Sequence, residues 1–299
     1  MVHAIINPIS GAGADPNVSR RRVAMIEAAA KARGLQTLIR ITERAGHARE
    51  LARDAVAAKA GAVIVWGGDG TINESGAALI GSQTVLGVVP AGSGNGLAAA
   101  LGVSRDLNTA VADAFDAPAH RIDAGVMNGR PFFNIAGIGF DARVAALFNA
   151  RAAGSRGGWP YIAIGVREGC RYCAVDYVVT LDAEPTRMRA LLIAFANGRE
   201  YGIGARIAPG ARLDDGVLDA IVVQDARNIV ARFWHARHLA TGTPERAPMV
   251  TARRVTKAVI ETPGAMEYHV DGEPGTAHGR IEVSIIPGAL CVRTRSLPG

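Results

Sequence analysis

The first third of the chain alternates short apolar runs with longer segments in which apolar residues recur at helical spacing. Four runs have the length and composition of buried strands, namely residues 2–7, 36–41, 62–66 and 85–89. Helical patterns occupy residues 18–33 and 46–60, and shorter helices are expected at 73–80 and 97–101. Strands joined by crossovers of roughly 20 to 30 residues predict a parallel α/β sheet.

The pattern changes after Arg121, where runs of strand length follow one another closely. The expected strands are residues 122–127, 131–136, 174–181, 188–197, 217–223, 254–262, 266–270 and 280–286. Turn signals such as Asn128-Gly129 and Pro263-Gly264 separate some of them. Inserted helices are expected at residues 142–151, 161–170 and 228–241. The pattern predicts an antiparallel β domain, with a last strand at 289–294 that returns to the first domain.

The length of 299 residues exceeds that of a typical single domain, which agrees with this change of pattern. We predict an N-terminal α/β domain at residues 1–121, joined by 288–299, and a C-terminal β domain at residues 122–287.

Glycine-rich loops follow three of the four predicted parallel strands. They are Pro8 to Gly13, Gly67-Gly68-Asp69-Gly70-Thr71, and Pro90 to Gly96. Open α/β sheets bind ligands at the carboxyl ends of their strands, and these loops all start there. Glycines let the backbone approach an anion closely, and a helix start supplies unpaired N–H groups. We therefore expect a phosphate site at this edge of the sheet.

Asp69 is the one acidic residue within the second loop. A carboxylate repels a bare phosphate, so its place there makes sense if a cation such as Mg²⁺ lies between them. The alternative is a tight turn that only joins strand to helix.

Other nucleotide and hydrolase motifs are absent or incomplete. No glycine-rich stretch ends in Gly-Lys-Ser/Thr, and Ser93 lacks the glycine two positions before it that an esterase elbow needs. Gly137 to Ala142 matches G-x-G-x-x-A. A dinucleotide site also needs an acidic residue about 20 positions later, and a Gly/Arg loop occupies that region here.

Two acidic turns remain open to more than one interpretation. Asp214-Asp215-Gly216 could bind a cation or could be an exposed turn between strands. Asp271-Gly272-Glu273 is typical of a hairpin loop, and its carboxylates could equally supply a base beside a metal-bound phosphate.

Composition narrows the classes of partner. Hydrophobic residues make up 49% and charged residues 20%, which excludes a disordered chain. The net charge of +6 permits attraction to anionic surfaces, but no nucleic-acid-reading motif is present, and we expect no nucleic-acid partner.

The three cysteines do not complete a zinc site. Without a signal peptide or a membrane-spanning run, we expect a soluble, cytoplasmic protein.

Together the glycine-rich loops and the acidic turns resemble those of the diacylglycerol kinase catalytic family of lipid kinases, which includes sphingosine and ceramide kinases. The similarity covers nearly the whole chain. The matching blocks are Asn7-Pro8 with Ser10-Gly11, Gly67 to Thr71 with Asn73-Glu74, Pro90 to Asn95, Asp123-Ala124-Gly125, Gly137 to Asp141, Leu213 to Gly216, and Asp271 to Glu273. The third loop and Thr42-Glu43-Arg44 are similar to sphingosine kinases, which favours a sphingoid or other single-chain lipid.

The resemblance implies a three-layer α/β domain followed by an antiparallel β-sandwich, with ATP bound in the cleft between them. It implies that nine residues contact the nucleotide: Asn7, Ser10, Thr42, Gly68, Gly70, Thr71, Gly92, Ser93 and Asn95. Asp69, which also contacts the nucleotide, and Asp123 would belong to the Mg²⁺ and phosphate network, and Asp214 and Asp215 would form an accessory Mg²⁺ site.

The resemblance also assigns the acceptor side. Glu273 would be the general base at the lipid hydroxyl, with Asp271 beside it, and Asp141 would orient the lipid head. On the nucleotide side, Arg151 or Arg156 would reach the phosphates. Apart from the resemblance, the basic stretch Arg151–Arg156 and the segment Trp159-Pro160-Tyr161 form the expected membrane-docking face, and the alternative is a solvated loop.

The predicted function is transfer of the γ-phosphoryl group of ATP to the hydroxyl of diacylglycerol or a sphingoid lipid. The protein would bind membranes peripherally and reversibly, and a homodimer is compatible with the sequence. One alternative is a kinase for a soluble acceptor such as NAD. The other is a non-catalytic nucleotide- or lipid-binding protein with the same fold.

Overall fold

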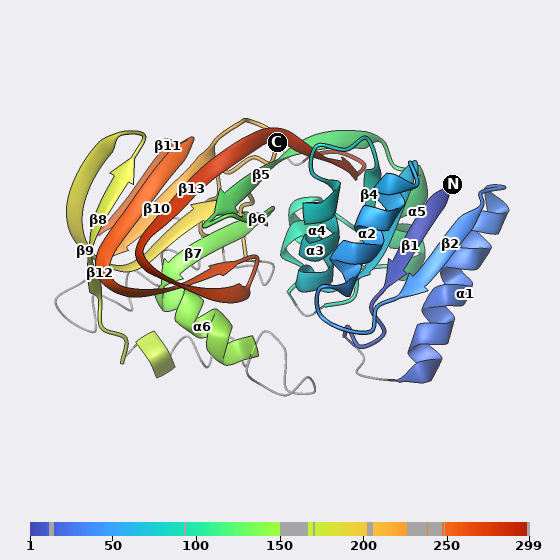
Figure 1. Cartoon of the computed structure of the whole chain (residues 1–299), viewed down its shortest axis with the longest axis horizontal. Coiled ribbons are helices and arrows are strands. Elements are labelled where there is room, and N and C mark those ends of the chain that lie inside the picture. Colours follow the sequence, from blue (N-terminus) through green and yellow to red (C-terminus); the bar gives the residue numbers. More distant parts are fainter. Residues whose placement is uncertain are drawn as a thin grey trace. The chain divides into compact units, whose positions relative to one another are not determined.

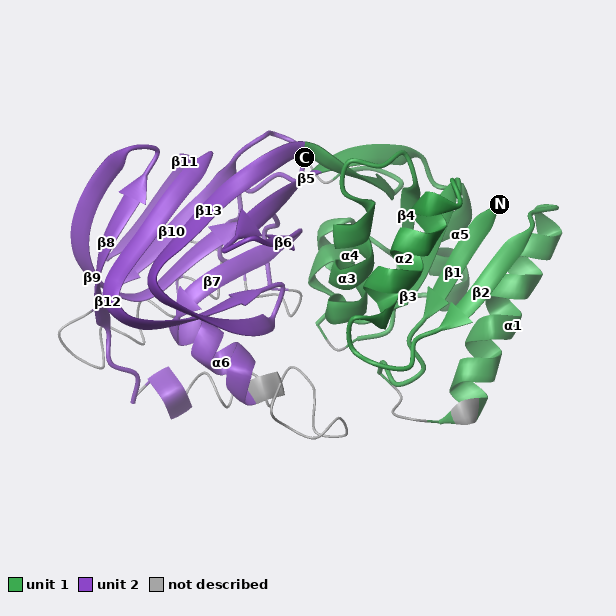
Figure 2. Ribbon diagram, in the orientation of Figure 1, with its two compact units in different colours: residues 1–122, 288–299 green, residues 123–287 purple. Residues whose placement is uncertain are grey.

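A computed structural model of the chain describes residues 1–11, 15–92, 94–149, 167–169, 171–201, 206–225, 238, 247 and 249–297. The chain divides into two compact units, shown in Figure 2: unit 1 comprises residues 1–122 and 288–299, and unit 2 comprises residues 123–287. Several predictions lie outside the described residues. They concern Ser93, Arg151, Arg156, the segment up to Tyr161, and most of the helices expected at 161–170 and 228–241.

A parallel sheet forms the centre of unit 1. Its four main strands are β1 (Val2–Ile6), β2 (Thr37–Ile41), β3 (Ala62–Gly67) and β4 (Val85–Pro90). They lie in the order β4-β3-β1-β2, and each neighbouring pair is parallel. All residues of β1 and β3 are buried, as expected for strands covered by helices on both faces. The predicted parallel α/β sheet is confirmed.

Helices cover both faces of this sheet and make three layers (Figure 1). They are α1 (Pro16–Ala32), α2 (His47–Ala57), α3 (Asp69–Leu79), α4 (Gly96–Ala100) and α5 (Leu107–Asp116). On one face, Ile26 of α1 and Phe115 of α5 share a buried cluster with Ile6 of β1. Even α1, the longest described helix, has only 17 residues, and no described helix is long and apolar enough to cross a membrane.

Helix α3 begins four residues before the predicted start at residue 73. Gly68 is its N-cap, and the Ile72 amide donates to the Gly68 carbonyl at 3.0 Å. Asp69 and Gly70 therefore belong to the first helical turn and not to a free loop. The glycines masked this start, because glycine has low helix propensity and indicates a loop when only sequence is considered.

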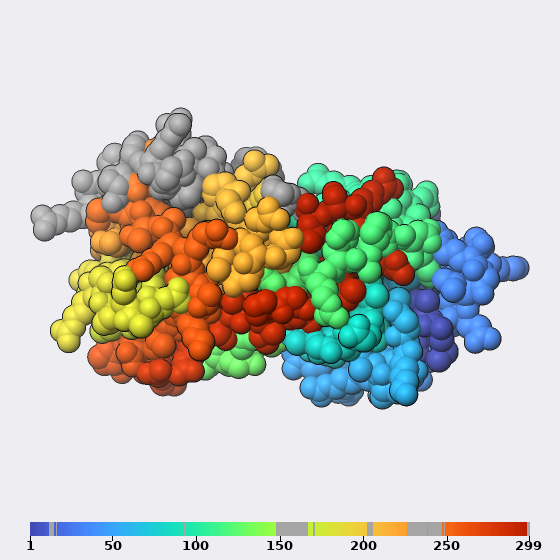
Figure 3. All heavy atoms as spheres, turned by 90° about the horizontal axis from the view of Figure 1, so that it is seen from above, coloured from blue at the N-terminus to red at the C-terminus, as the bar shows by residue number. Residues whose placement is uncertain are grey.

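Unit 2 is built from antiparallel strands that curve around a buried core. The strands are β5 (Ala119–Met127), β6 (Arg130–Phe132), β7 (Ile135–Gly139), β8 (Val175–Leu181), β9 (Glu184–Ala196), β10 (Leu218–Gln224), β11 (Val250–Val255), β12 (Lys257–Val270) and β13 (Glu273–Arg293). Phe132, Phe195 and Ile260 are fully buried among them. Helix α6 (Phe140–Asn149) follows β7 directly. The β8–β9 hairpin reaches the molecular surface (Figure 3, yellow), and its turn residues Asp182 and Ala183 are exposed.

Several strand boundaries in unit 2 differ from the prediction. The strand expected at 131–136 is divided between β6 and β7, and the one expected at 254–262 is divided between β11 and β12. Strand β12 runs through Pro263-Gly264, where a turn was expected, because a register shift between Glu261 and Ala265 absorbs both residues. Strand β13 is one strand of 21 residues, where two short strands were expected. Its last part belongs to unit 1, where Val292 pairs in parallel with Leu86 of β4.

Strand β4 packs very closely on α5 at Gly87, and we expect Gly87→Ala to destabilise unit 1. An added Cβ would overlap the carbonyl oxygen of Ala114 and lie 3.1 Å from its Cα. Overpacking of this kind typically costs about 1–3 kcal/mol in the free energy of unfolding, measurable by urea denaturation. Gly61→Ala is the control, since its nearest neighbour would be 3.9 Å away. Equal unfolding midpoints for the two variants would contradict the close packing.

Candidate functional site

The first two glycine-rich loops of unit 1 are joined by side-chain hydrogen bonds. The Asn7 amide donates to the Thr71 hydroxyl at 2.8 Å, and the Gly68 amide donates to the Ser10 hydroxyl at 3.2 Å. Asn7 and Ser10 follow β1, whereas Gly68 and Thr71 follow β3, its neighbour in the sheet. The predicted gathering of these loops at one sheet edge is confirmed.

Asp69 joins the second loop to the third. Its carboxylate accepts the backbone amide of Asn95 at 2.8 Å and that of Gly96 at 2.6 Å. Asn95 is itself held in the third loop, because its side chain accepts from the Gly92 amide at 2.7 Å and donates to the Gly92 carbonyl at 2.5 Å. All three loops therefore form one connected group around Asp69.

The glycines are needed here because the loop backbones nearly touch. A Cβ on Gly92 would lie 3.0 Å from the Cα of Gly68 and 2.9 Å from the Oδ1 of Asn95. A Cβ on Gly94 would lie 2.9 Å from a carboxylate oxygen of Asp69. Side chains at these positions would force the loops apart, so the glycine spacing follows from the packing.

Arg22, which sequence reasoning missed, holds the first loop from behind. It lies on α1, is 7% exposed, and donates to the carbonyl oxygens of Asn7 and Ser10, both at 2.7 Å. Its guanidinium also lies over the ring of Trp66, 5.7 Å from the centroid. Burial lowers the pKa of Arg22 from its ordinary value. No motif marks this arginine, since it is one of three consecutive arginines and only the fold selects it.

Thr42 follows β2, next to the first loop. Its amide donates to the Ile6 carbonyl at 2.9 Å, and its side chain is buried. The following turn is held by Glu74 of α3, which accepts the Gly46 amide at 2.7 Å. A fourth loop thus borders the same edge of the sheet.

In unit 2, Asp123 lies against the Asp214-Asp215-Gly216 turn. It is 2% exposed, and its carboxylate accepts the Gly216 amide at 2.7 Å. Asp214 accepts from the Arg212 guanidinium at 3.2 Å, and Asp215 forms an ion pair with Arg254. Asp123 thus contacts the turn that carries the other two predicted metal ligands of this unit, Asp214 and Asp215. Each of those two carboxylates is paired with an arginine.

The glycines before Asp141 make room for its carboxylate. A Cβ on Gly137 would collide with that carboxylate, with Oδ1 only 2.8 Å away. The carboxylate accepts the Ala142 amide at 2.8 Å and the Tyr201 hydroxyl at 3.1 Å. Strand β7 pairs antiparallel with β9 and β12, so this motif is not a dinucleotide-binding βαβ turn. Burial raises the pKa of Tyr172 to about 12, and the Asp141 charge adds to the shift.

Asp271 and Gly272 form a two-residue hairpin turn between β12 and β13, and Glu273 is the first residue of β13. Val270 pairs with Glu273, and the two residues between them have positive φ, 47° at Asp271 and 85° at Gly272. The Asp271 carboxylate accepts three backbone amides of the neighbouring segment, Phe133 at 2.9 Å, Asn134 at 2.9 Å and Ile135 at 3.2 Å. Glu273 is exposed at the start of β13. The hairpin interpretation is confirmed, and the chemical role of Glu273 stays a prediction.

Oxygen ligands are present in both units. Within the described part of the chain, no three histidine, cysteine, aspartate or glutamate side chains gather as a metal-binding group. Mg²⁺ often needs only one or two carboxylates, completing its shell with phosphate oxygens and water. The donor set around Asp69, with Ser10 and Thr71 hydroxyls nearby, fits that requirement.

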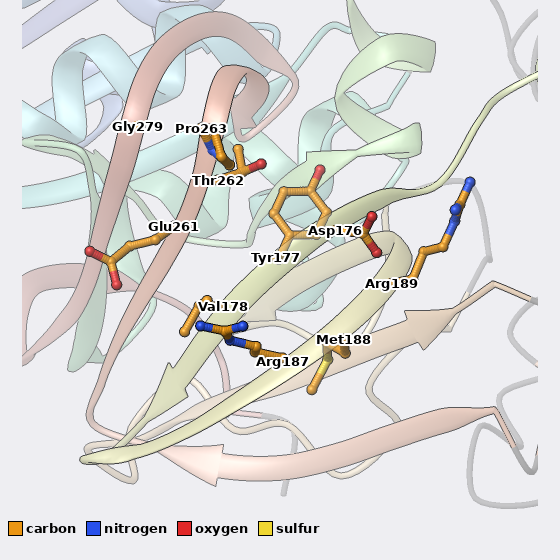
Figure 4. A pocket seen from close by; sticks show the side chains of 10 residues that line it. All are labelled: Asp176, Tyr177, Val178, Arg187, Met188, Arg189, Glu261, Thr262, Pro263 and Gly279. Carbon is orange, nitrogen blue, oxygen red and sulfur yellow. The ribbon is translucent and has the colours of Figure 1, made fainter.

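A further cavity of about 730 Å³ lies in unit 2, between β8, β9 and β12 (Figure 4). Its lining includes Asp176, Arg187, Arg189 and Glu261 and none of the predicted site residues. The lining combines these charged side chains with apolar ones, among them Tyr177, Val178 and Met188.

Known proteins match the chain over most of its length. The diacylglycerol kinase catalytic domain matches residues 1–127, and the YegS C-terminal NAD kinase beta sandwich-like domain matches residues 134–294. A protein of Chromohalobacter salexigens, named probable lipid kinase YegS-like, is 30% identical over 263 residues, which is 87% of this chain and 84% of the relative. The chain belongs to the diacylglycerol kinase family of lipid kinases.

One further relative agrees with that membership, and one solved structure shares the fold. A diacylglycerol kinase of Mycobacterium tuberculosis is 33% identical to this chain over 308 residues, which cover 97% of this chain and 94% of the relative. The crystal structure of a diacylglycerol kinase from Bacillus anthracis has the same fold, with a TM-score of 0.75 at 21% identity over 98% of this chain and 96% of that one. The predicted family and the predicted pair of folds are confirmed.

We expect Arg22→Ala to destabilise unit 1 by about 2 kcal/mol or more. The substitution leaves the carbonyl oxygens of Asn7 and Ser10 without a charged donor, and hydrogen bonds to charged groups are worth about 1.5–3 kcal/mol each. Urea denaturation would measure the loss. Arg21→Ala is the matched control, because Arg21 is the preceding residue of the same helix and is exposed. A loss no larger than that of the control would mean that Arg22 does not hold the loop.

Proposed function

We propose that the protein is a lipid kinase that uses Mg²⁺ and ATP and transfers the γ-phosphoryl group to the hydroxyl of a membrane lipid. The observation that carries the proposal is the connected group of three glycine-rich loops at the carboxyl edge of the parallel sheet. That arrangement supplies a phosphate cradle in a chain of the lipid kinase family.

The nucleotide side of the reaction belongs to unit 1. The proposed contacts are Asn7, Ser10, Thr42, Gly68, Gly70, Thr71, Gly92, Ser93 and Asn95, together with Asp69. The chain lacks a P-loop lysine, so backbone N–H groups must provide much of the favourable field for the phosphates. The close packing of Gly68 on Gly92 brings the backbones of the second and third loops together, which supports this role.

Asp69 and Asp123 would each belong to the Mg²⁺ and phosphate network, and Asp214 with Asp215 would hold an accessory ion. Bound Mg²⁺ neutralises charge on the transferring phosphoryl group. Asp69 keeps the third loop in place through the amides of Asn95 and Gly96, and this central position among the loops supports its role in the network. The accessory site would require Asp214 and Asp215 to share or exchange their arginine partners.

The acceptor side belongs to unit 2. Glu273 would take the proton of the lipid hydroxyl, since an alcohol is a poor nucleophile at neutral pH. Asp141 would orient the lipid head. Asp271 stays beside the base in this proposal, and its three backbone amides support a role in holding the turn instead of in proton transfer.

The acceptor is proposed to be diacylglycerol or a sphingoid lipid. A relative named diacylglycerol kinase supports the first, and the sequence of the third loop favours the second. In either case the protein would meet its substrate at a membrane surface, bound peripherally. A homodimer is compatible with this role.

The experiment that tests the function is transfer of labelled γ-phosphate from Mg·ATP to a panel of acceptors. The panel holds sphingosine, ceramide, diacylglycerol and monoacylglycerol in mixed micelles, and NAD in solution. A labelled lipid establishes the function and names the acceptor. Label on NAD alone would replace it with a kinase for a soluble acceptor. Bound ATP without any product would favour a non-catalytic binding protein.

Glu273→Ala is expected to lower kcat about 10²–10⁴-fold, the usual contribution of a general base. The side chain is exposed, so the fold should be unaffected and the thermal midpoint should stay close to that of the wild type. Glu282→Ala is the matched control, a second exposed glutamate of β13. Unchanged turnover in Glu273→Ala would remove Glu273 from the role of base.

Asp69→Asn is expected to lower turnover at least about 100-fold and to weaken binding of Mg·ATP. The substitution removes the charge that the metal needs, which is worth several kcal/mol, and one of the acceptors that hold the third loop. Isothermal titration calorimetry would give the affinity for ATP with and without Mg²⁺. Asp113→Asn on α5 provides the control. Wild-type affinity for Mg·ATP would contradict the placing of the ion at Asp69.

A further inference from the structure

His269 connects two parts of unit 2 that carry the proposed acceptor chemistry. It lies on β12, is 3% exposed, and its Nε2 is 3.1 Å from Oδ2 of Asp141. On the other side of the ring, Nδ1 accepts the backbone amide of Gly272 at 3.2 Å. Gly272 directly precedes Glu273 in the hairpin turn.

These two contacts define the protonation of the ring. A nitrogen that accepts an N–H cannot carry a proton, so the Nδ1 of His269 is bare. The proton of the neutral imidazole then sits on Nε2 and is donated to Asp141. The ring acts as a neutral connector that accepts at the turn and donates to the carboxylate.

Both ends of this connection are otherwise well held. Asp141 also accepts from the Tyr201 hydroxyl and the Ala142 amide. The turn is held on its other side by the Asp271 carboxylate and by the Asp271 amide, which donates to the Ile135 carbonyl at 3.0 Å. Gly272 is the position between that anchor and Glu273, so its amide is well placed to influence the base.

We propose that His269 is a positioning residue that couples the Asp141 carboxylate to the turn that carries Glu273. This inference rests on the proposed function, in which Asp141 orients the lipid head and Glu273 accepts the proton. A single buried ring then sets where the lipid head binds relative to where the base stands. Sequence reasoning missed it because a lone histidine within a strand has no motif.

Two substitutions separate the two contacts. His269→Asn places an amide oxygen near the position of Nδ1, so it keeps an acceptor for Gly272 but is too short to reach Asp141. His269→Gln places an amide N–H near the position of Nε2, so it keeps the donor to Asp141 and loses the acceptor for Gly272. His278 is an exposed histidine of β13, and the same two substitutions there are the controls.

The kinetic expectation differs for the two variants. His269→Asn should raise KM for the lipid about tenfold or more with a smaller effect on kcat, because Asp141 loses a donor. His269→Gln should lower kcat about tenfold or more with a smaller effect on KM, because the turn beside Glu273 is loosened. KM for ATP should stay unchanged in both. Rates are expressed per folded enzyme, with the folded fraction taken from thermal unfolding.

Coupling to Asp141 is tested by a double-mutant cycle. If His269 acts on lipid binding through Asp141, the effects of His269→Asn and Asp141→Asn on KM for the lipid should not add. Fully additive effects, or identical changes in kcat and KM for the Asn and Gln variants at position 269, would reduce His269 to a structural residue and overturn the proposal.

The ring itself provides a readout that does not depend on turnover. Nitrogen-15 NMR of histidine-labelled protein should show a neutral ring with a proton on Nε2, assigned by its absence in His269→Asn. Asp141→Asn should shift that Nε2 signal. A proton on Nδ1, or a charged ring at neutral pH, would overturn the connection. A wild-type enzyme that phosphorylates no lipid would overturn the proposed function, while the NMR result would still decide the connection.

Discussion

Unit 1 depends on one carboxylate that accepts backbone amides from a distant segment. Asp69 stands in the first turn of α3 and accepts the amides of Asn95 and Gly96. Hydrogen bonds to an ionised acceptor are worth about 1.5–3 kcal/mol each, enough to hold a loop of glycines whose own conformational entropy opposes order. That anchor adds to the hydrogen bond from the Ala91 amide to the Gly67 carbonyl in keeping Gly68 and Gly92 close together.

Unit 2 also uses carboxylates that accept backbone amides, at its own turns. Asp271 accepts three backbone amides, and Asp182 accepts those of Thr256 and Lys257 in a second hairpin. Such carboxylates satisfy amides that the strand ladder leaves unpaired. They also hold the backbone at positive φ, 47° at Asp271 and 44° at Asp182, a conformation that residues other than glycine rarely adopt. Acidic residues therefore shape the ends of strands in both units.

Features of short range and strong periodicity could be predicted from the sequence. The parallel strands follow from their apolar runs, and the meeting of three glycine-rich loops follows from the rule that parallel strands end at one edge. Helix α5 was not predicted, although Ala110, Val111, Ala114 and Phe115 recur at helical spacing. The continuity of β12 through Pro263-Gly264 could not be predicted, since a bulge and a turn have the same sequence signal.

The candidate site shows where motifs stop being informative. Asp69, Asp271 and Asp141 stand in glycine-rich motifs, and each accepts backbone amides, whereas the exposed Glu273 stands beside such an anchor. The motifs therefore contain both the proposed general base and the carboxylates that hold loops in place. Only their hydrogen-bond partners distinguish the two kinds of carboxylate. Arg22 and His269 stand outside every motif, because long-range packing alone brings them to the loops that they hold. Residues that position a site are therefore the ones that sequence patterns find last.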